Sequence, residues 1–236
     1  MAETVICWDL DETLGFFRPV ANELLANAAA RGDLGVSRRL EALVGEFLGA
    51  RPAPAPLRLR EGIADLLAAV RERGIRQVVT TGAFREYALL GLEKAGLAPL
   101  FDAVFSREAL WDELAGGKRY TPVLERFAVG ADRILIIGDD FKKDRASDHM
   151  DAVMICDQDG LDHPAAMLLP VIEALTAAES VGAGFVSLLA SARPHPGGAT
   201  VERGGVTASI GYWGNYTRGE RTPVVSALRW SRAQNG

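Results

Sequence analysis

The sequence has few of the residues that build disulfide frameworks or zinc sites. Its 236 residues include only two cysteines and three histidines. Cys7 and Cys156 lie in apolar runs typical of buried strands, so we expect two reduced core thiols and no disulfide. The histidines, His149, His163 and His195, lack the spacing of zinc ligands. Unpaired thiols fit a reducing compartment, and we expect a cytoplasmic protein.

Long hydrophobic runs and an excess of positive charge are also missing. No apolar run approaches the ~18 residues of a membrane-spanning helix, and the first residues, MAETVICW, lack a basic leader with an apolar core. The net charge of -5 gives no overall attraction to nucleic acid or to an anionic membrane. With 48% hydrophobic and 24% charged residues, the composition predicts a globular protein with a sizeable core and no membrane partner.

Short apolar runs alternate with helical patterns along most of the chain. The predicted strands cover residues 4–8, 76–80, 102–105, 133–137 and 152–156. Segments with helical spacing of apolar residues separate these strands. This alternation predicts an α/β fold with a Rossmann-like parallel sheet.

One region interrupts the alternation near the start of the chain. Residues 16–50 have the pattern of two helices, and the Pro-rich segment RPAPAPL follows as a stiff connector. We therefore expect a small helical cap at 16–57, inserted into a core formed by 1–15 and 58–178. Such a cap would shade an active site from water and select substrates.

Polar side chains follow the first, second and fourth predicted strands. The carboxyl ends of parallel strands share one edge of the sheet, where open α/β folds bind ligands. A lysine in the segment GGKRYTP precedes the helix that leads into the fourth strand. The candidate site residues, in chain order, are Asp9, Asp11, Thr80, Thr81, Gly82, Lys118, Asp139, Asp140 and Asp144.

These residue types together suit phosphoryl transfer. One carboxylate can attack phosphorus and form an aspartyl-phosphate, while a second acid moves the protons. Carboxylates can also hold Mg²⁺, and a hydroxyl and an ammonium can bind the phosphoryl oxygens. Taken singly, each residue has a simpler interpretation, since Asp is common in turns and Lys is usually a solvated surface residue. Their occurrence at successive strand ends favours a single catalytic site.

Four segments resemble, in the same order, the motifs of the haloacid dehalogenase superfamily, the Asp-nucleophile phosphatases. DLDET resembles the family's Asp-x-Asp-x-Thr motif, VVTTG its strand-ending Ser/Thr, GKRY its lysine loop, and IIGDDFKKD its acidic metal loop. The resemblance covers roughly residues 4–175 and leaves the C-terminal portion uncovered.

The resemblance implies a role for each candidate residue. Asp9 would be the nucleophile and Asp11 the general acid/base. The phosphoryl group would be bound by Lys118, by Gly82 and by Thr80 or Thr81, of which we prefer Thr80 because it follows the apolar run directly. Mg²⁺ would be held by Asp9, Asp11 and Asp139, with either Asp144 or Asp140 completing the site.

The resemblance also narrows the reaction. Dehalogenase members lack an acid at the second motif position, so Asp11 favours phosphoryl transfer. We expect a Mg²⁺-dependent phosphatase of a small phosphorylated metabolite. One alternative is a phosphatase of phosphoproteins or nucleic-acid ends, because DLDETL also occurs in protein phosphoserine phosphatases. Another alternative is a non-catalytic module with the same fold, which the intact set of candidate residues argues against.

The segment after Ala178 has a different character. Residues 193–236 carry a local charge of +4 and half of the protein's tyrosines and tryptophans. We expect residues 179–236 to form a C-terminal addition with a β-hairpin that turns at the GG pair, 204 and 205. The simpler interpretation of this segment is an ordered edge addition or a contact between identical subunits. The alternative is a surface for an extended anionic substrate such as single-stranded nucleic acid.

Overall fold

A computed structural model describes most of the chain. The described residues are 3–32, 35, 38, 56–149, 151–157, 160–195, 198–203, 206–211 and 227–230.

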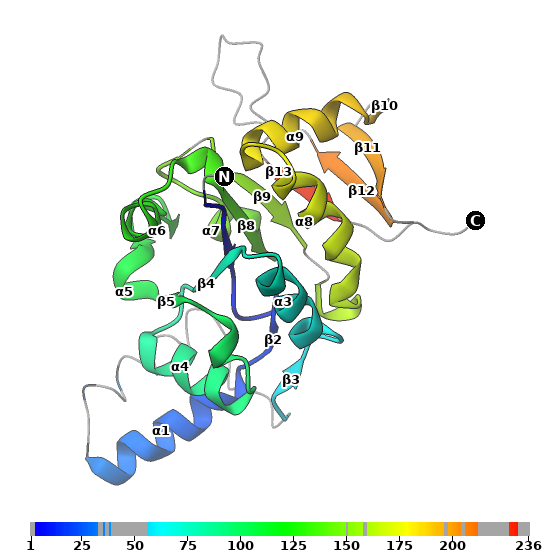
Figure 1. The fold of residues 1–236 in the computed structure, drawn as a ribbon. Coiled ribbons are helices and arrows are strands. Elements are labelled where there is room, and N and C mark those ends of the chain that lie inside the picture. Colours follow the sequence, from blue (N-terminus) through cyan, green and yellow to red (C-terminus); the bar gives the residue numbers. More distant parts are fainter. Residues whose placement is uncertain are drawn as a thin grey trace.

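Five parallel strands form the centre of the fold (Figure 1). In chain order they are β1 (Val5–Trp8), β4 (Arg76–Thr80), β5 (Ala103–Phe105), β8 (Ile134–Gly138) and β9 (Val153–Cys156). Their order across the sheet is β9-β8-β1-β4-β5, and Cys7 of β1 lies between Val78 and Ile136 of its neighbours. The predicted Rossmann-like parallel sheet is therefore confirmed, with β1 at its middle.

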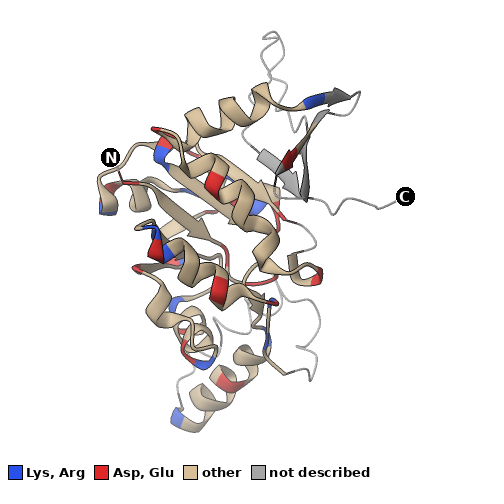
Figure 2. Ribbon diagram, turned by 45° about the vertical axis from the view of Figure 1, so that its right-hand side comes forward, with Lys and Arg blue, Asp and Glu red and all other residues tan. Residues whose placement is uncertain are grey.

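The side chains of β1 alternate between two apolar layers. Ile6 and Trp8 belong to a large cluster on one face of the sheet, while Val5 and Cys7 belong to a smaller cluster on the other. This alternation follows from the two-residue period of a strand. The core strands carry almost no charged residues, whereas the helices and loops around them do (Figure 2).

Helices cover both faces of the sheet. The helices that follow the cap segment are α3 (Ile63–Glu72), α4 (Arg85–Lys94), α5 (Arg107–Leu110), α6 (Thr121–Phe127), α7 (Phe141–Asp144), α8 (Leu169–Thr176) and α9 (Val181–Ala190). Short 3₁₀ turns are η1 (Ala98–Leu100), η2 (Ala131–Arg133), η3 (Gly160–Asp162) and η4 (Ala165–Leu168). Two small antiparallel pairs complete the core: β2 (Gly15–Phe16) with β3 (Arg58–Leu59), and β6 (Trp111–Asp112) with β7 (Gly117–Lys118).

The cap segment leaves the core at β2 and returns at β3. Helix α1 (Pro19–Arg31) follows β2, contacts α4 and extends away from the sheet (Figure 1). Val20, Ala21 and Leu24 of α1 are buried. The second helix predicted for the insertion and most of the Pro-rich connector lie outside the described residues.

The C-terminal segment differs in part from the expectation. Residues 181–190 form α9, although we expected the segment after Ala178 to be a β addition. The strands that follow are β10 (Arg193–His195), β11 (Gly198–Arg203), β12 (Val206–Gly211) and β13 (Ala227–Trp230). β11 and β12 pair in antiparallel register with Arg203 opposite Val206, and the GG pair itself lies outside the described residues. β13 pairs with β9, so β10 to β13 join the five core strands in one nine-stranded sheet.

Two further expectations concern the cysteines and membrane segments. Cys7 and Cys156 are buried free thiols, and burial raises the pKa of the Cys156 thiol to about 12. Within the described part of the chain, no single helix is long and apolar enough to cross a membrane. The bent pair Ala165–Thr176 and Val181–Ala190 reaches that length and composition only when its two halves are taken together.

Candidate active site

Asp9 lies directly behind β1, at the carboxyl edge of the sheet. Its backbone N–H donates to the carbonyl of Ile137 on β8 at 2.8 Å, which continues the strand pairing and fixes the residue. The side chain is buried, and its Oδ1 accepts a hydrogen bond from the Lys118 ammonium at 2.5 Å. The predicted nucleophile is thus held by a cation 109 residues away in the chain.

The Lys118 ammonium has three acceptors for its three protons. Besides Asp9 it contacts Oδ1 of Asp144 at 2.6 Å and the backbone carbonyl of Thr80 at 2.7 Å. The residue is only 1% exposed. Burial alone would lower the pKa of Lys118, but Asp144 and Asp9 raise it well above its ordinary value. Lys118 therefore stays charged and links three segments of the site.

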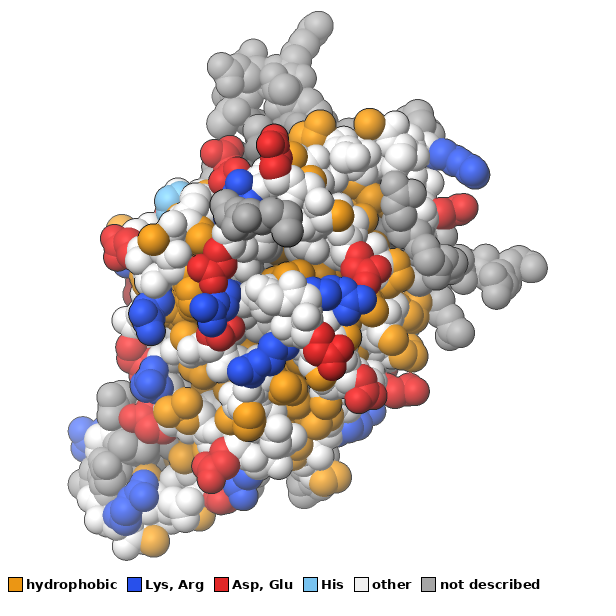
Figure 3. All heavy atoms as spheres, in the orientation of Figure 1, with side chains coloured by type: hydrophobic (Ala, Val, Ile, Leu, Met, Phe, Trp, Pro, Cys, Tyr) orange, Lys and Arg blue, Asp and Glu red, His pale blue; other side chains and the backbone are white. Residues whose placement is uncertain are grey.

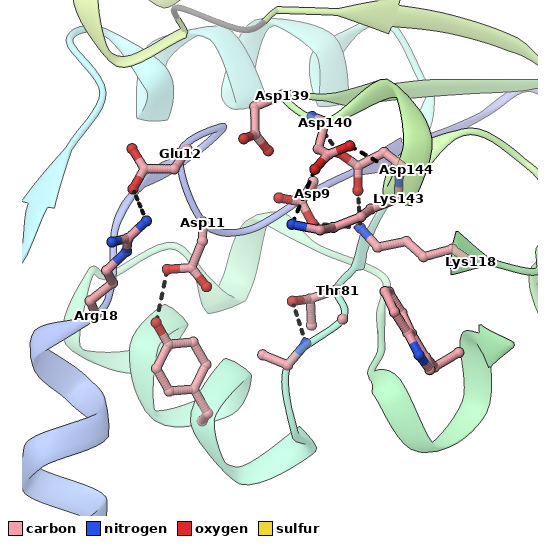
Figure 4. A pocket seen from close by; sticks show the side chains of 14 residues that line it. Asp9, Asp11, Glu12, Arg18, Thr81, Lys118, Asp139, Asp140, Lys143 and Asp144 are labelled. Carbon is pink, nitrogen blue, oxygen red and sulfur yellow. Dashed lines mark hydrogen bonds and ion pairs between the residues drawn. The ribbon is translucent and has the colours of Figure 1, made fainter. Parts of the chain in front are cut away.

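Asp139, Asp9 and Asp144 form a group of carboxylates around this lysine (Figure 4). One carboxylate oxygen from each lies within 4.8 Å of the others. Asp144 reaches the group because residue 138 is glycine: a Cβ there would come within 2.3 Å of Oδ2 of Asp144. The same Oδ2 accepts the backbone N–H of Asp140 at 3.0 Å. The glycine therefore allows the Asp144 carboxylate to lie close to those of Asp9 and Asp139.

The charge balance of this group shifts its pKa values. The Lys118 ammonium contacts two of the three carboxylates and cannot neutralise all three, and the side chains of Asp9 and Asp144 are buried. Burial first, and then the charge of Asp144, raise the pKa of Asp9 well above its ordinary value and that of Asp139 to about 7. This pattern is typical of a site that receives an additional cation.

Asp11 is held on another side of the pocket. Its Oδ1 accepts a hydrogen bond at 2.8 Å from the hydroxyl of Tyr87 on α4. Burial raises the pKa of Asp11 to about 6, and the Tyr87 hydrogen bond limits that rise. A carboxyl group with a pKa near neutrality suits an acid that also acts as a base. Among the described residues, the group of close carboxylates contains Asp9, Asp139 and Asp144, and the Asp11 carboxylate lies outside it.

The two threonines after β4 have different surroundings, and these surroundings favour Thr81 as the phosphate ligand over Thr80, the residue that we expected. The hydroxyl of Thr80 is fully buried and donates to the carbonyl of Trp8 at 3.4 Å. Thr81 lines the pocket with Gly82, and its Oγ1 accepts the backbone N–H of Ala83 at 3.0 Å. The Thr81 hydroxyl proton can therefore point to a ligand, whereas the Thr80 hydroxyl donates its proton to the backbone of β1.

Asp140 also lines the pocket, but its carboxylate is engaged in capping a helix. Its carboxylate accepts the backbone N–H groups of Lys142 and Lys143 at 3.0 and 3.1 Å and so caps α7. Although burial acts in the other direction, hydrogen bonds and the charge of Lys143 lower the pKa of Asp140. Among the described residues, the close group of carboxylates includes Asp144 and does not include Asp140.

The pocket between these residues has a volume of about 110 Å³. This is well below the ~300–1,000 Å³ of pockets that enclose a drug-sized ligand, so the pocket suits a small polar group. Sequence analysis missed several of its lining residues, which come from four separate segments: Glu12, Arg18, Tyr87, Trp111 and Lys143. Their side chains carried no signal in the sequence, because only the folded chain brings them together.

Comparison with protein families decides the classification. The model of the haloacid dehalogenase-like hydrolase family matches residues 29–147. The chain belongs to this family. The matched range includes Thr81, Lys118, Asp139 and Asp144, and it begins after Asp9 and Asp11.

The chain is also similar to several solved structures. A predicted phosphoglycolate phosphatase from Haemophilus somnus is 17% identical, with a TM-score of 0.49 over 70% of this chain and 91% of that one. CbbY from Rhodobacter sphaeroides, in complex with phosphate, is 22% identical, with a TM-score of 0.42 over 66% and 86%. L-2-haloacid dehalogenase from Xanthobacter autotrophicus is 14% identical, with a TM-score of 0.43 over 78% and 88%. No curated protein matches this haloacid dehalogenase-like hydrolase.

Proposed function

We propose that this hydrolase is a Mg²⁺-dependent phosphatase that cleaves a phosphate monoester through an aspartyl-phosphate on Asp9. The observation that carries the proposal is the buried Asp9–Lys118–Asp144 network, with a second acid, Asp11, across the same pocket. A phosphatase of this kind needs a nucleophile, an acid and cations at one place, and this pocket contains each of them.

The donor set fits Mg²⁺. All three members of the close group, Asp9, Asp139 and Asp144, offer carboxylate oxygens, which are the ligands that this hard cation prefers. The pocket lining contains six acidic and three basic residues, so a phosphate dianion would meet net repulsion there without an added cation. When bound, Mg²⁺ would offset this negative charge and that of the phosphoryl oxygens.

The chain's own residues account for the remaining steps. Lys118 holds Oδ1 of Asp9, so Oδ2 would attack phosphorus while the bond from phosphorus to the ester oxygen breaks. Asp11 would give its proton to that leaving oxygen. Asp11 would then take a proton from a water molecule as the water attacks the aspartyl-phosphate, which releases phosphate and restores Asp9. The Thr81 hydroxyl and the segment at the N-terminus of α4 would bind the phosphoryl oxygens.

A small phosphorylated metabolite is the substrate class that we propose. The pocket volume of about 110 Å³ suits its phosphoryl group, and the rest of the molecule would lie outside. On the described part of the face in Figure 3, acidic and basic side chains are interspersed, which is not typical of a surface that binds a nucleic-acid backbone.

A substrate screen with Mg²⁺ tests this proposal. Phosphorylated metabolites, phosphopeptides and phosphate-ended oligonucleotides would be offered to the full chain, and released phosphate would be measured. We expect turnover of at least one small metabolite, abolished by EDTA and restored by Mg²⁺. Exclusive turnover of phosphopeptides or oligonucleotides would favour the second substrate class, and no turnover at all would favour a non-catalytic module.

A further inference from the structure

Tyr87 is the residue of α4 that reaches the active-site pocket. It is 1% exposed and lines the pocket beside Asp11. Its hydroxyl donates to Oδ1 of Asp11 at 2.8 Å, across 76 residues of sequence. The ring is fixed by its position on the buried face of α4, together with Ala88 and Leu92. A rigid helix thus presents one hydroxyl to the predicted acid.

This hydroxyl is a permanent donor. Burial and the charge of Asp11 raise the pKa of Tyr87 far above its ordinary value, so the phenol does not ionise at working pH. The Asp11 carboxylate also accepts a hydrogen bond from the backbone N–H of Phe17, and the charge of Arg18 acts on it, but among the described residues Tyr87 is the one side chain shown hydrogen-bonded to it. The Tyr87 hydrogen bond and the Phe17 backbone therefore fix the direction of the carboxyl group together, and the tyrosine is the part of this restraint that a side-chain substitution can remove.

Resting on the proposed function, we propose that Tyr87 is a positioning residue that aims Asp11 at the leaving oxygen of the ester. A general acid must lie within hydrogen-bond reach of the atom that it protonates. Misplacement of a reacting group by ~1 Å can cost ~100-fold in rate. An alkyl ester needs a correctly placed acid most, because its alkoxide leaves poorly unless it is protonated. An activated aryl ester needs the acid little, because its phenolate leaves readily without a proton.

The test compares leaving groups in Tyr87→Phe, which removes the hydroxyl and keeps the ring. We expect kcat on an alkyl phosphate to fall ~10-fold to 100-fold, with p-nitrophenyl phosphate turnover within ~3-fold of wild type and KM nearly unchanged. Adding Tyr87→Phe to Asp11→Asn should cause no further loss, because the tyrosine would have no acid left to position.

Tyr120→Phe is the matched control. It also removes one buried phenol hydroxyl, which in this case donates to the backbone carbonyl of Asp144 at 2.7 Å, on the nucleophile's side of the pocket. Any loss from this change should be the same for alkyl and aryl esters, since Asp11 keeps its partner.

Each outcome decides the inference. Equal losses on both esters in Tyr87→Phe, or a further loss in the double variant, would overturn the role of Tyr87 and leave the proposed function intact. A wild-type protein that hydrolyses neither ester with Mg²⁺ would overturn the proposed function, and this inference with it.

Discussion

Lys118 holds three segments of the site in fixed positions, because each of its ammonium protons has a separate acceptor. Two of these acceptors are Asp9, directly after β1, and Asp144, at the end of α7, and the third is the backbone carbonyl of Thr80. Charge-assisted hydrogen bonds of this kind are stronger than neutral ones, and they weaken little with salt when buried. The nucleophile is therefore oriented before a substrate arrives.

The two threonines provide a prediction at this scale. Thr81→Val should lower kcat/KM about 10-fold to 150-fold, because it removes a hydroxyl that would donate to a charged phosphoryl oxygen. Thr80→Val makes the same chemical change one residue earlier, where the hydroxyl contacts Trp8. It should alter kcat/KM little and lower stability by about 1 kcal/mol. Steady-state kinetics and urea unfolding measure both variants, and a larger kinetic loss in Thr80→Val would restore our first preference.

At the scale of elements, the packing of α8 against α9 depends on one close contact. A Cβ at Gly184 would lie 2.2 Å from the carbonyl oxygen of Leu175, which is backbone and cannot move aside. Phe185 and Leu188 lie on the same buried side of α9. The glycine therefore lets the two helices approach more closely than any other residue would allow.

A pair of glycine substitutions tests this contact. Gly184→Ala should destabilise the protein by about 1–3 kcal/mol, because it forces α8 and α9 apart. Gly182→Ala is the matched control in the same helix, where a Cβ would meet nothing closer than 3.7 Å. Alanine should stabilise that position by about 0.5–1 kcal/mol, since it has less backbone freedom to lose than glycine. Urea denaturation measures both changes, and equal effects at the two positions would contradict the packing account.

At the scale of the whole molecule, the buried carboxylates couple stability to pH and metal. The folded pKa values of Asp11, about 6, and Asp139, about 7, lie above the ~3.9 of a free aspartate, and that of Asp9 is also raised. Without metal, the folded protein thus binds more protons than the unfolded chain between about pH 4 and pH 7. The pKa values of Asp140 and Asp148 are lowered, so their effect falls below this window.

The sign of this coupling gives a prediction. In EDTA, the free energy of unfolding should fall as pH rises from about 5 to about 7.5, because the raised groups must ionise inside the fold. Added Mg²⁺ should stabilise the protein more at the higher pH, where it binds ionised carboxylates. Urea midpoints at the two pH values, with and without Mg²⁺, measure both effects. A midpoint in EDTA that rises over this range would contradict the charge balance described for the site.

Features of the fold that come from local sequence patterns could be predicted, whereas contacts between distant segments could not. The five core strands are continuous apolar runs bounded by polar residues, so their positions and the carboxyl-edge site followed from pattern alone. Helix α9 was missed because Gly182 and Gly184 dilute its apolar period, although Ser180 is a normal N-cap that accepts the N–H of Ala183. No local pattern could place Tyr87 beside Asp11, because that contact exists only when α4 packs on the core.

The measurement that tests the central claim most directly is hydrolysis of p-nitrophenyl phosphate with Mg²⁺ by the wild type and by Asp9→Asn. The amide keeps the shape of the side chain but cannot attack phosphorus, so turnover should fall ~1,000-fold or more. Circular dichroism on the same samples should show an unchanged fold. Wild-type turnover by a folded Asp9→Asn protein would contradict an aspartyl-phosphate mechanism at this site.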